Sequence, residues 1–306
     1  MRIVSLLPSA TEILFAIGAG AEIVGVTHEC DFPADAKRLP VLTASSLPSA
    51  ISSAQIDTHV REQLHAGSGL YTLDRELLAS LEPDLIVTQE LCAVCAVSYD
   101  LVSDAVKRLR IDTRVISLEP SSFDDVLSTI QTLGHITGHE MEAQMLRSRL
   151  DARITRLQAQ IALLTRHPQP RMLLLEWSDP PMSAGHWIPD ILQLAGATPV
   201  LANPGENSRV ITWEEISASD PDVIVLSPCG FDLDATRNAA RALEAQGSWH
   251  DLRAYHEREI YLLDGNAYVN RPGPRLVDTA EILATILFED AIESPIVDPA
   301  AWEPLR

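Results

Sequence analysis

Glu82-Pro83-Asp84-Leu85-Ile86-Val87 and Asp220-Pro221-Asp222-Val223-Ile224-Val225 are the two stretches that decide the fold. Each is an acidic turn containing proline that leads into an aliphatic run. Short aliphatic runs bounded by turn residues are typical of buried β-strands. Because the same pattern occurs once in each half of the chain, we predict two related lobes.

Strand and helix signals alternate on both sides of these turns, which is typical of parallel sheets covered by helices. Between the two alternating regions, apolar residues recur every three or four positions and predict a continuous helix over 140–166, about 40 Å long. We therefore predict an α/β protein with two Rossmann-like lobes and mostly parallel sheets, joined by one long α-helix. The expected parts are an N-terminal lobe (1–121), a helical backbone (122–167) and a C-terminal lobe (168–306).

Composition and charge narrow the classes of function. The 306 residues are 46% hydrophobic and 22% charged, an ordinary globular composition. The net charge of −20 argues against nucleic acid and anionic membranes as partners. We expect no membrane insertion, because no run approaches the ~20 apolar residues that a bilayer requires. Residues 1–8 read as a strand without the features of a signal peptide, so we expect a cytoplasmic location, or a periplasmic one if a leader has been removed.

All four cysteines follow predicted strands: Cys30, Cys92, Cys95 and Cys229. His28 lies in the same loop as Cys30. In open α/β sheets, ligands bind at the carboxyl ends of the strands, and thiolates and imidazoles are good ligands for soft metals. The pattern predicts contact with a metal ion or with a metal-containing ligand. Thiols that merely line a pocket, and a redox pair of Cys92 and Cys95, are the alternatives.

Three aromatic residues also follow predicted strands: Trp177, Trp187 and Tyr268. Aromatic side chains in such positions can stack on a flat macrocycle and bury a large apolar area. Ordinary packing in the core or at its rim is the alternative for each of them.

A series of segments, taken in order, resembles the cobalamin-binding and iron–siderophore-binding proteins of ABC importers. The resemblance extends over nearly the whole chain, and the cobalamin branch is the more similar. It rests on Arg2-Ile3-Val4-Ser5-Leu6-Leu7-Pro8-Ser9-Ala10-Thr11-Glu12, Val24-Gly25-Val26, Asp31-Phe32-Pro33, the two stretches quoted first, Asp179-Pro180-Pro181, Gly185, and Arg271-Pro272-Gly273-Pro274-Arg275. It implies two lobes bridged by one long helix, with a small-molecule ligand captured between them.

The resemblance also implies roles for single residues. Arg271 matches an arginine that hydrogen-bonds ligand amides. Glu76 and Glu214 match the glutamates that dock onto arginines of the membrane permease, a role open to this chain only if it is exported. His28 and Glu29, with Cys30, stand where a tyrosine-bearing loop is usual. This departure predicts a ligand whose metal the protein reaches directly.

We therefore predict a binding protein, not an enzyme, that captures a corrinoid, with cobalamin first among the candidates. One alternative is a metal ion, haem or iron chelate held by Cys and His in the same cleft. Another is a chelatase-like enzyme in which His28 and Glu29 accept the metal and the proton. Enzyme signatures such as a Walker phosphate loop, GxGxxG or GxSxG do not occur in the sequence.

Overall fold

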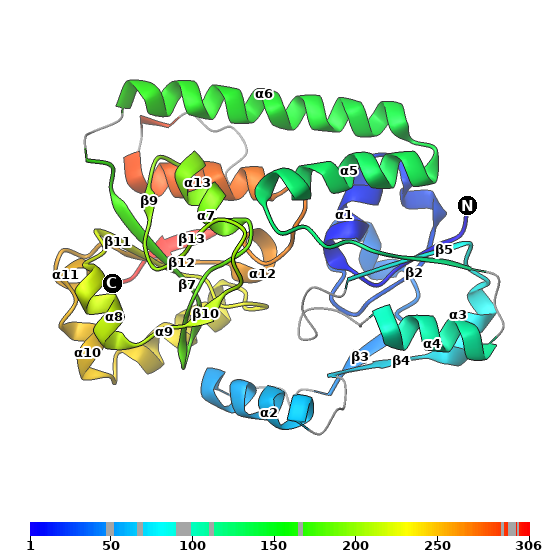
Figure 1. Ribbon diagram of the computed structural model, residues 1–306, viewed down its shortest axis with the longest axis horizontal. Helices are drawn as coiled ribbons and strands as arrows, with labels where there is room; N and C mark the ends of the chain where they lie inside the picture. Colours follow the sequence, from blue (N-terminus) through cyan, green and yellow to red (C-terminus); the bar gives the residue numbers. More distant parts are fainter. Residues whose placement is uncertain are drawn as a thin grey trace. The chain divides into compact units, whose positions relative to one another are not determined.

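The computed structural model describes residues 1–46, 52–65, 70–89, 99–109, 113–164, 168–288, 291–292, 298 and 300–306 (Figure 1). The chain divides into two compact units. Unit 1 comprises residues 1–51, 55–120 and 127–148, and unit 2 comprises residues 52–54, 121–126 and 149–306.

Unit 1 is built on a parallel four-stranded sheet in the order β2-β1-β5-β6. Its strands are β1 (Ile3–Ser5), β2 (Ile23–Val26), β5 (Leu85–Thr88) and β6 (Arg114–Ser117). A separate antiparallel ribbon pairs β3 (Thr43–Ser45) with β4 (Tyr71–Leu73). The helical segments that begin between these strands are α1 (Pro8–Ala16), η1 (Ala19–Glu22), η2 (Ala34–Arg38), α2 (Ser53–His65), α3 (Arg75–Leu81) and α4 (Tyr99–Leu109).

Unit 2 is built on a larger mixed sheet in the order β10-β8-β7-β11-β12-β13, with β9 pairing β7. Its strands are β7 (Arg171–Ser178), β8 (Pro181–Ser183), β9 (Thr198–Pro199), β10 (Arg209–Val210), β11 (Val223–Leu226), β12 (Ile260–Leu263) and β13 (Trp302–Pro304). Its helices are α7 (Ile188–Leu194), α8 (Trp213–Ser219), α9 (Leu233–Leu243), α10 (Gly247–His250), α11 (Arg253–His256), α12 (Gly265–Tyr268) and α13 (Leu276–Phe288).

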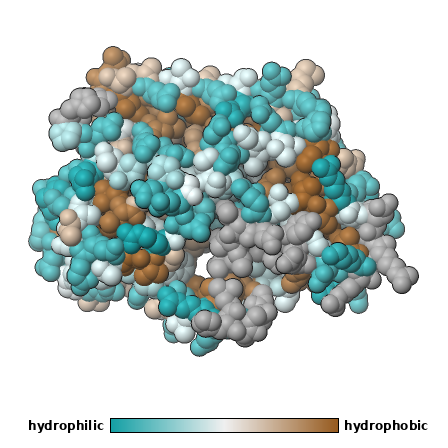
Figure 2. Space-filling view, viewed as in Figure 1, coloured by the Kyte–Doolittle hydropathy of each residue, from teal (hydrophilic) through white to brown (hydrophobic). Residues whose placement is uncertain are grey.

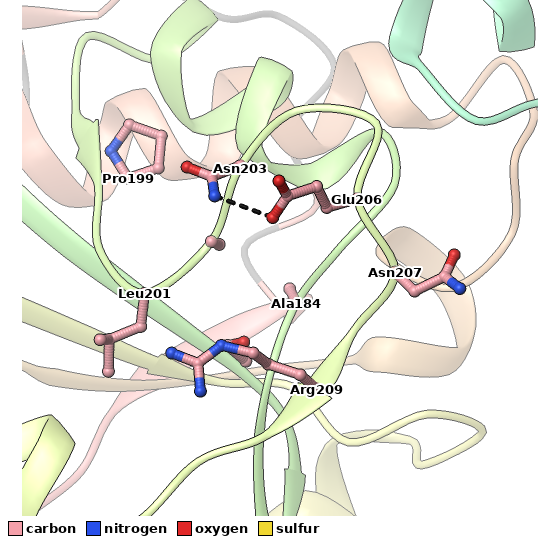
Figure 3. Close-up of a pocket in the computed structure, with 9 residues that line it drawn as sticks. Ala184, Pro199, Leu201, Asn203, Glu206, Asn207 and Arg209 are labelled. Carbon is pink, nitrogen blue, oxygen red and sulfur yellow. Dashed lines mark hydrogen bonds between the residues drawn. The ribbon is translucent and has the colours of Figure 1, made fainter.

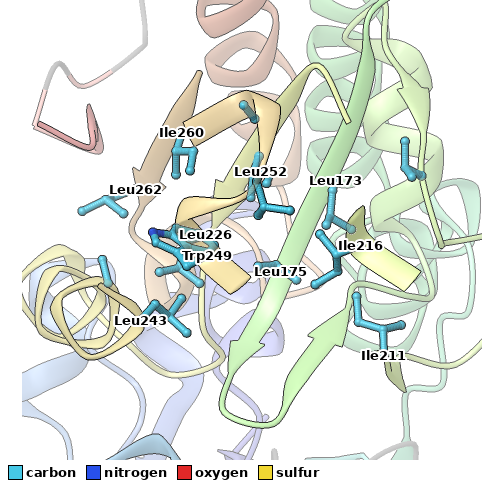
Figure 4. Packing of buried hydrophobic residues seen from close by; sticks show 14 residues of the cluster. Leu173, Leu175, Ile211, Ile216, Leu226, Leu243, Trp249, Leu252, Ile260 and Leu262 are labelled. Carbon is cyan, nitrogen blue, oxygen red and sulfur yellow. The ribbon is translucent and has the colours of Figure 1, made fainter. Parts of the chain in front are cut away.

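Each unit has its own hydrophobic core. In unit 1, Val4, Leu6 and Ile86 are fully buried among residues from α3 and α4. In unit 2, the aliphatic side chains of β7, β11 and β12 surround Trp249, which is also fully buried (Figure 4). The central strands are buried along their whole length, as expected of strands covered on both faces.

The two acidic turns, at 82–84 and 220–222, have the same structure. Glu82 and Asp220 end α3 and α8 in the left-handed conformation, with φ of 41° and 42°. The aspartates two positions later, Asp84 and Asp222, each accept a hydrogen bond from a backbone N–H at the start of a neighbouring strand, at 2.7 Å in both cases. The sequence repeat is therefore also a structural repeat.

The long helix α6 (Glu140–Leu164) follows α5 (Phe123–Thr137), and both helices contribute residues to each unit. In unit 2, Arg153 of α6 forms ion pairs with two acidic residues of α13. Its guanidinium lies 2.5 Å from Asp278 Oδ1 and 2.9 Å from Glu281 Oε2. All three side chains are at most 15% exposed, so this cluster fixes α6 to α13 through buried charge.

The predicted fold class, two α/β lobes with parallel sheets and one long helix, is confirmed. Two features differ from expectation. Strand β7 is longer than predicted and includes Trp177, and β8, β10 and β13 add antiparallel edges in unit 2. The boundaries proposed at 121 and 167 stay a prediction.

Figure 2 shows one face on which hydrophilic side chains dominate and apolar ones gather in separate patches. Within the described ranges, the helices are too short or too polar to cross a bilayer.

Candidate functional site

In unit 1, the predicted site residues lie in the loop after β2. This loop, Thr27-His28-Glu29-Cys30, begins where β2 ends and turns back on itself, because the N–H of Cys30 donates to the carbonyl of Thr27 at 3.0 Å. Strand β5 lies in the same sheet as β2. At the carboxyl end of β5, Thr88 and Gln89 are both buried. Polar side chains therefore gather at the sheet edge where parallel α/β proteins bind ligands.

His28 is fixed on one side of its ring. Its Nδ1 lies 2.6 Å from Thr43 Oγ1, and its ring centre lies 5.5 Å from that of Tyr71. Its Nε2 lies 3.1 Å from Glu29 Oε1, yet it is buried and has no hydrogen-bond partner of acceptable geometry. A held imidazole with one nitrogen without a hydrogen bond can serve as a metal ligand.

Cys30 is only 5% exposed, and its Sγ lies 3.0 Å from Thr11 Oγ1 on α1. Thr11 in turn donates to Ser5 Oγ at 2.8 Å. The predicted ligands Cys92 and Cys95 lie outside the described residues. A metal-binding role for these cysteines stays a prediction.

In unit 2, predicted site residues lie where the ends of β7 and β11 meet. Trp177 packs edge-on against Phe231, with ring centres 5.3 Å apart, and its indole N–H donates to the carbonyl of Asp179 at 3.1 Å. Cys229 is half-buried, and its N–H donates to the carbonyl of Glu176 at 3.0 Å. The structure thus places Trp177 and Cys229 at one edge of this unit, although Trp177 lies within β7 and not after it as predicted.

The loop after β12 positions the other predicted residues of unit 2. Arg271 is 6% exposed and donates to Asn266 Oδ1 at 2.8 Å. Trp187 is 8% exposed and donates to the carbonyl of Val269 at 3.0 Å, so its indole is part of the packing of this loop. Tyr268 is half-buried, with the guanidinium of Arg275 5.7 Å from its ring centre.

Glu76 and Glu214 occupy equivalent places. Each is the second residue of its helix, after the capping residues Asp74 and Thr212. Both glutamates are exposed. Their equivalent positions agree with the spacing in the sequence, while their proposed docking role stays a prediction.

His186 is a residue that the sequence analysis missed. It has a φ of 52°, a left-handed conformation that is uncommon for residues other than glycine. Its N–H donates to the carbonyl of Glu206 at 2.6 Å, and its carbonyl accepts from Gly205 at 3.0 Å. Burial lowers the pKa of His186, which keeps the imidazole neutral at pH 7. The only sequence signal for it was the neighbouring Gly185.

A surface cavity of about 190 Å³ lies beside the same loop (Figure 3). Asn203 donates to Glu206 Oε2 at 2.8 Å along its wall, and Arg209 also lines it. The charge of Arg209 is already compensated, because its guanidinium is paired with Glu215 at 2.9 Å. The cavity is separate from the residues predicted to form the site.

Within the part of the chain that the structure describes, three or more His, Cys, Asp or Glu side chains do not come together in an arrangement that could hold a metal ion. His28 Nε2 and Glu29 Oε1 form a pair of metal-compatible atoms 3.1 Å apart.

Comparison with known proteins places these features in context. The sequence profile of a family described as periplasmic binding protein matches residues 3–267. An uncharacterized ABC transporter substrate-binding lipoprotein from Bacillus subtilis is 24% identical, over 95% of this chain and 81% of that protein. A vitamin B12-binding protein from Vibrio cholerae is 23% identical, over 94% of this chain and 88% of that protein.

The solved structure of a periplasmic heme binding protein from Pseudomonas aeruginosa is similar in fold. It superimposes with a TM-score of 0.72 at 22% identity and covers 100% of this chain and 95% of that chain. At this identity the similarity establishes the arrangement of strands and helices and leaves the ligand open.

Proposed function

The chain belongs to the periplasmic binding protein family, and we propose that it is the substrate-binding component of an ABC importer for a metal-centred tetrapyrrole, cobalamin first among them. Membership of a family of transport receptors also confirms the prediction that the chain is not an enzyme. The observation that carries the proposed ligand class is His28, whose buried Nε2 lacks a hydrogen bond at the ligand edge of the unit 1 sheet.

Cobalamin is favoured by the polar groups of unit 2. Arg271 and Asn266 form a hydrogen-bonded pair that offers neutral amide and guanidinium chemistry to the side-chain amides of a corrin. Trp177 and Phe231 offer aromatic surface beside that pair. The vitamin B12-binding relative from Vibrio cholerae supports the same ligand.

Haem is the second candidate, and His28 is the observation that favours it. An imidazole nitrogen is a common axial ligand of haem iron. The heme-binding protein from Pseudomonas aeruginosa, with the same fold, supports this reading. In either case the metal belongs to the transported molecule and is not a resident cofactor of the protein.

The test is an absorbance titration of the purified ligand-free protein with aquacobalamin and, separately, with haemin. We expect one of the two to bind with 1:1 stoichiometry and to change its visible spectrum, because an imidazole replaces water on the metal. His28→Ala should abolish that spectral change. The matched control is His256→Ala, which removes an exposed imidazole on α11. A protein that binds neither compound at micromolar concentration would contradict the proposal.

Location and docking follow from the same proposal. The relatives' names describe a lipoprotein and a periplasmic protein, which supports the periplasmic alternative over the cytoplasmic one. Outside the cytoplasm, Glu76 and Glu214 would be available to a permease, one on each unit. Two separated charges set the orientation and association rate of docking more than its affinity. Cell fractionation with an antibody against the chain distinguishes the two locations.

A further inference from the structure

His28 is surrounded by two threonine hydroxyls that the proposed function does not use. Thr43, the first residue of β3, lies with its Oγ1 2.6 Å from His28 Nδ1 and 2.8 Å from Thr27 Oγ1. The backbone N–H of His28 donates to the same Thr43 oxygen at 3.0 Å. Both threonines are buried, at 4% and 6% exposure. Three groups therefore share one hydroxyl in a site with little access to water.

The hydroxyl of Thr43 has one proton and two lone pairs to distribute among these groups. The backbone N–H of His28 can only donate, so it occupies one lone pair. If His28 Nδ1 carries a proton, it takes the second lone pair, and Thr43 donates its own proton to Thr27 Oγ1. The proton and both lone pairs of the Thr43 hydroxyl then all take part in hydrogen bonds.

The opposite tautomer leaves a buried donor without a partner. If Thr43 donated to a bare Nδ1, the ring proton would be on Nε2. That atom is buried, and Glu29 Oε1, at 3.1 Å, is not placed to accept a hydrogen bond of acceptable geometry. Buried N–H groups without partners are rare because each loses its hydration. The geometry thus favours the proton on Nδ1.

A bare Nε2 has a lone pair to offer to a cation, and the carboxylate of Glu29, with Oε1 3.1 Å away, makes the surroundings of this nitrogen favourable to positive charge.

We infer that Thr43 is a positioning residue that holds the proton of His28 on Nδ1, so that the Nε2 lone pair is directed at the metal of the transported tetrapyrrole. This inference rests on the proposed function for its ligand. Its structural half, the tautomer of His28, stands independently of any ligand. A metal-bound histidine generally donates the N–H of its other ring nitrogen to a fixed acceptor. Here the hydroxyl oxygen of Thr43 is that acceptor.

The first experiment measures the tautomer in the ligand-free protein. Long-range ¹H–¹⁵N correlation spectra of uniformly ¹⁵N-labelled protein, recorded at a pH where histidine is neutral, identify which ring nitrogen carries the proton. His28→Ala assigns the signal. We expect protonated Nδ1 and bare Nε2 in the wild type. The opposite pattern in the wild type overturns the inference, whatever the protein binds.

The second experiment uses Thr43→Val, which keeps the side-chain shape and removes the hydroxyl. We expect His28 to shift to the Nε2–H tautomer and the affinity for the bound probe, aquacobalamin or haemin, to fall ~10- to 100-fold. Thr43→Ser should restore both readouts. Thr72→Val is the matched control, because Thr72 is exposed on the neighbouring strand β4.

The outcomes separate this inference from the proposed function. If neither probe binds the wild type, the proposed ligand is wrong, and the spectra of wild type and Thr43→Ser still decide the tautomer. If a probe binds and Thr43→Val leaves both tautomer and affinity unchanged, Thr43 does not position His28. Should Thr43→Val not fold, the wild-type spectrum still decides the tautomer, and a proton found on Nε2 overturns the inference.

Discussion

The backbone N–H of Arg171 donates to Asp222 Oδ2 at 2.7 Å, joining the first residue of β7 to the turn that precedes β11. The arginine side chain adds a second bond, to the carbonyl of Ser219 at 2.8 Å. Arg2 and Asp84 form the corresponding pair in unit 1. In each unit, one aspartate thus aligns two neighbouring strands at the edge opposite the candidate site.

Asp222→Asn should destabilise unit 2 in a pH-dependent way. Burial would raise the pKa of Asp222, but the N–H of Arg171 and the guanidinium of Arg253 outweigh it, so the pKa is lowered. A carboxylate with a lowered pKa contributes stability above its unfolded pKa of about 3.9, and this contribution is lost as the pH falls through the folded value. The urea midpoints of wild type and variant should therefore differ at pH 7 and move toward each other as the pH falls below about 3.9.

The control for this prediction is Asp251→Asn, which changes an exposed aspartate of the same unit. It should leave the midpoints unchanged at both pH values. A gap between wild type and Asp222→Asn that is equal at pH 7 and pH 3 would show that the charge of Asp222 does not matter.

Arg153→Met should be strongly destabilising, by ~3–5 kcal/mol, because it leaves Asp278 and Glu281 buried without their counter-charge. Burial already raises the pKa of Asp278 despite Arg153, so its loss should raise that pKa further. Thermal or urea unfolding measures the effect. The triple variant Arg153→Met/Asp278→Asn/Glu281→Gln should recover most of the loss, and no recovery would contradict a charge-based explanation.

Gly185→Ala should disrupt the loop that holds His186. A methyl group at this position would lie 2.3 Å from the backbone nitrogen of Ser208 and 2.5 Å from the carbonyl oxygen of Glu206. Overpacking against backbone typically costs about 1–3 kcal/mol. Gly247→Ala is the matched control, since a methyl group there meets no atom within 4 Å. Unfolding midpoints should fall for the first variant only.

Thiol labelling should distinguish the two described cysteines. In a Cys92→Ser/Cys95→Ser background, Cys229 should react faster than Cys30, because Cys229 is half-buried and Cys30 is only 5% exposed. Mass spectrometry of labelled peptides measures both rates. If the double substitution also weakens binding of the tetrapyrrole or shifts the absorbance spectrum of the complex, Cys92 and Cys95 contact the metal. An unchanged affinity and spectrum would remove both cysteines from the proposed site.

Glu76→Arg and Glu214→Arg should each slow the docking of ligand-loaded protein onto its permease in lipid nanodiscs, with greater loss at low salt than at high salt. Ligand binding itself should not change. Glu142→Arg, on the exposed face of α6, makes the same charge change at a position without a predicted role. Equal slowing by all three variants would indicate an effect of net charge and not of the docking positions.

Much of the fold could be predicted from local sequence signals. The repeated acidic turns gave both central strands, and apolar spacing gave α6 to within two residues of its observed end at Leu164. Edge elements such as β8 and β10 were missed because strands of two or three residues contain too little periodicity to recognise.

The candidate site was predictable only in part. Placement after strands predicted the sheet edges at which His28 and Cys229 lie, because a parallel sheet brings the carboxyl ends of its strands to one edge; their role stays a prediction. The contact of His28 with Thr43 depends on where the β3–β4 ribbon crosses the β2 loop, which no local pattern encodes. The left-handed backbone of His186 likewise depends on a turn twenty residues away, at Gly205 and Glu206.

The strand β13 has a consequence for handling the protein. It pairs antiparallel with β12, and Leu305 adds a further bond to the carbonyl of Ile260 at 2.8 Å. Deleting the last six residues would leave one side of β12 with unpaired N–H and carbonyl groups, a template for strands of other molecules. Truncated preparations should therefore self-associate into fibrils or precipitate, and purification tags are better placed at the other end of the chain.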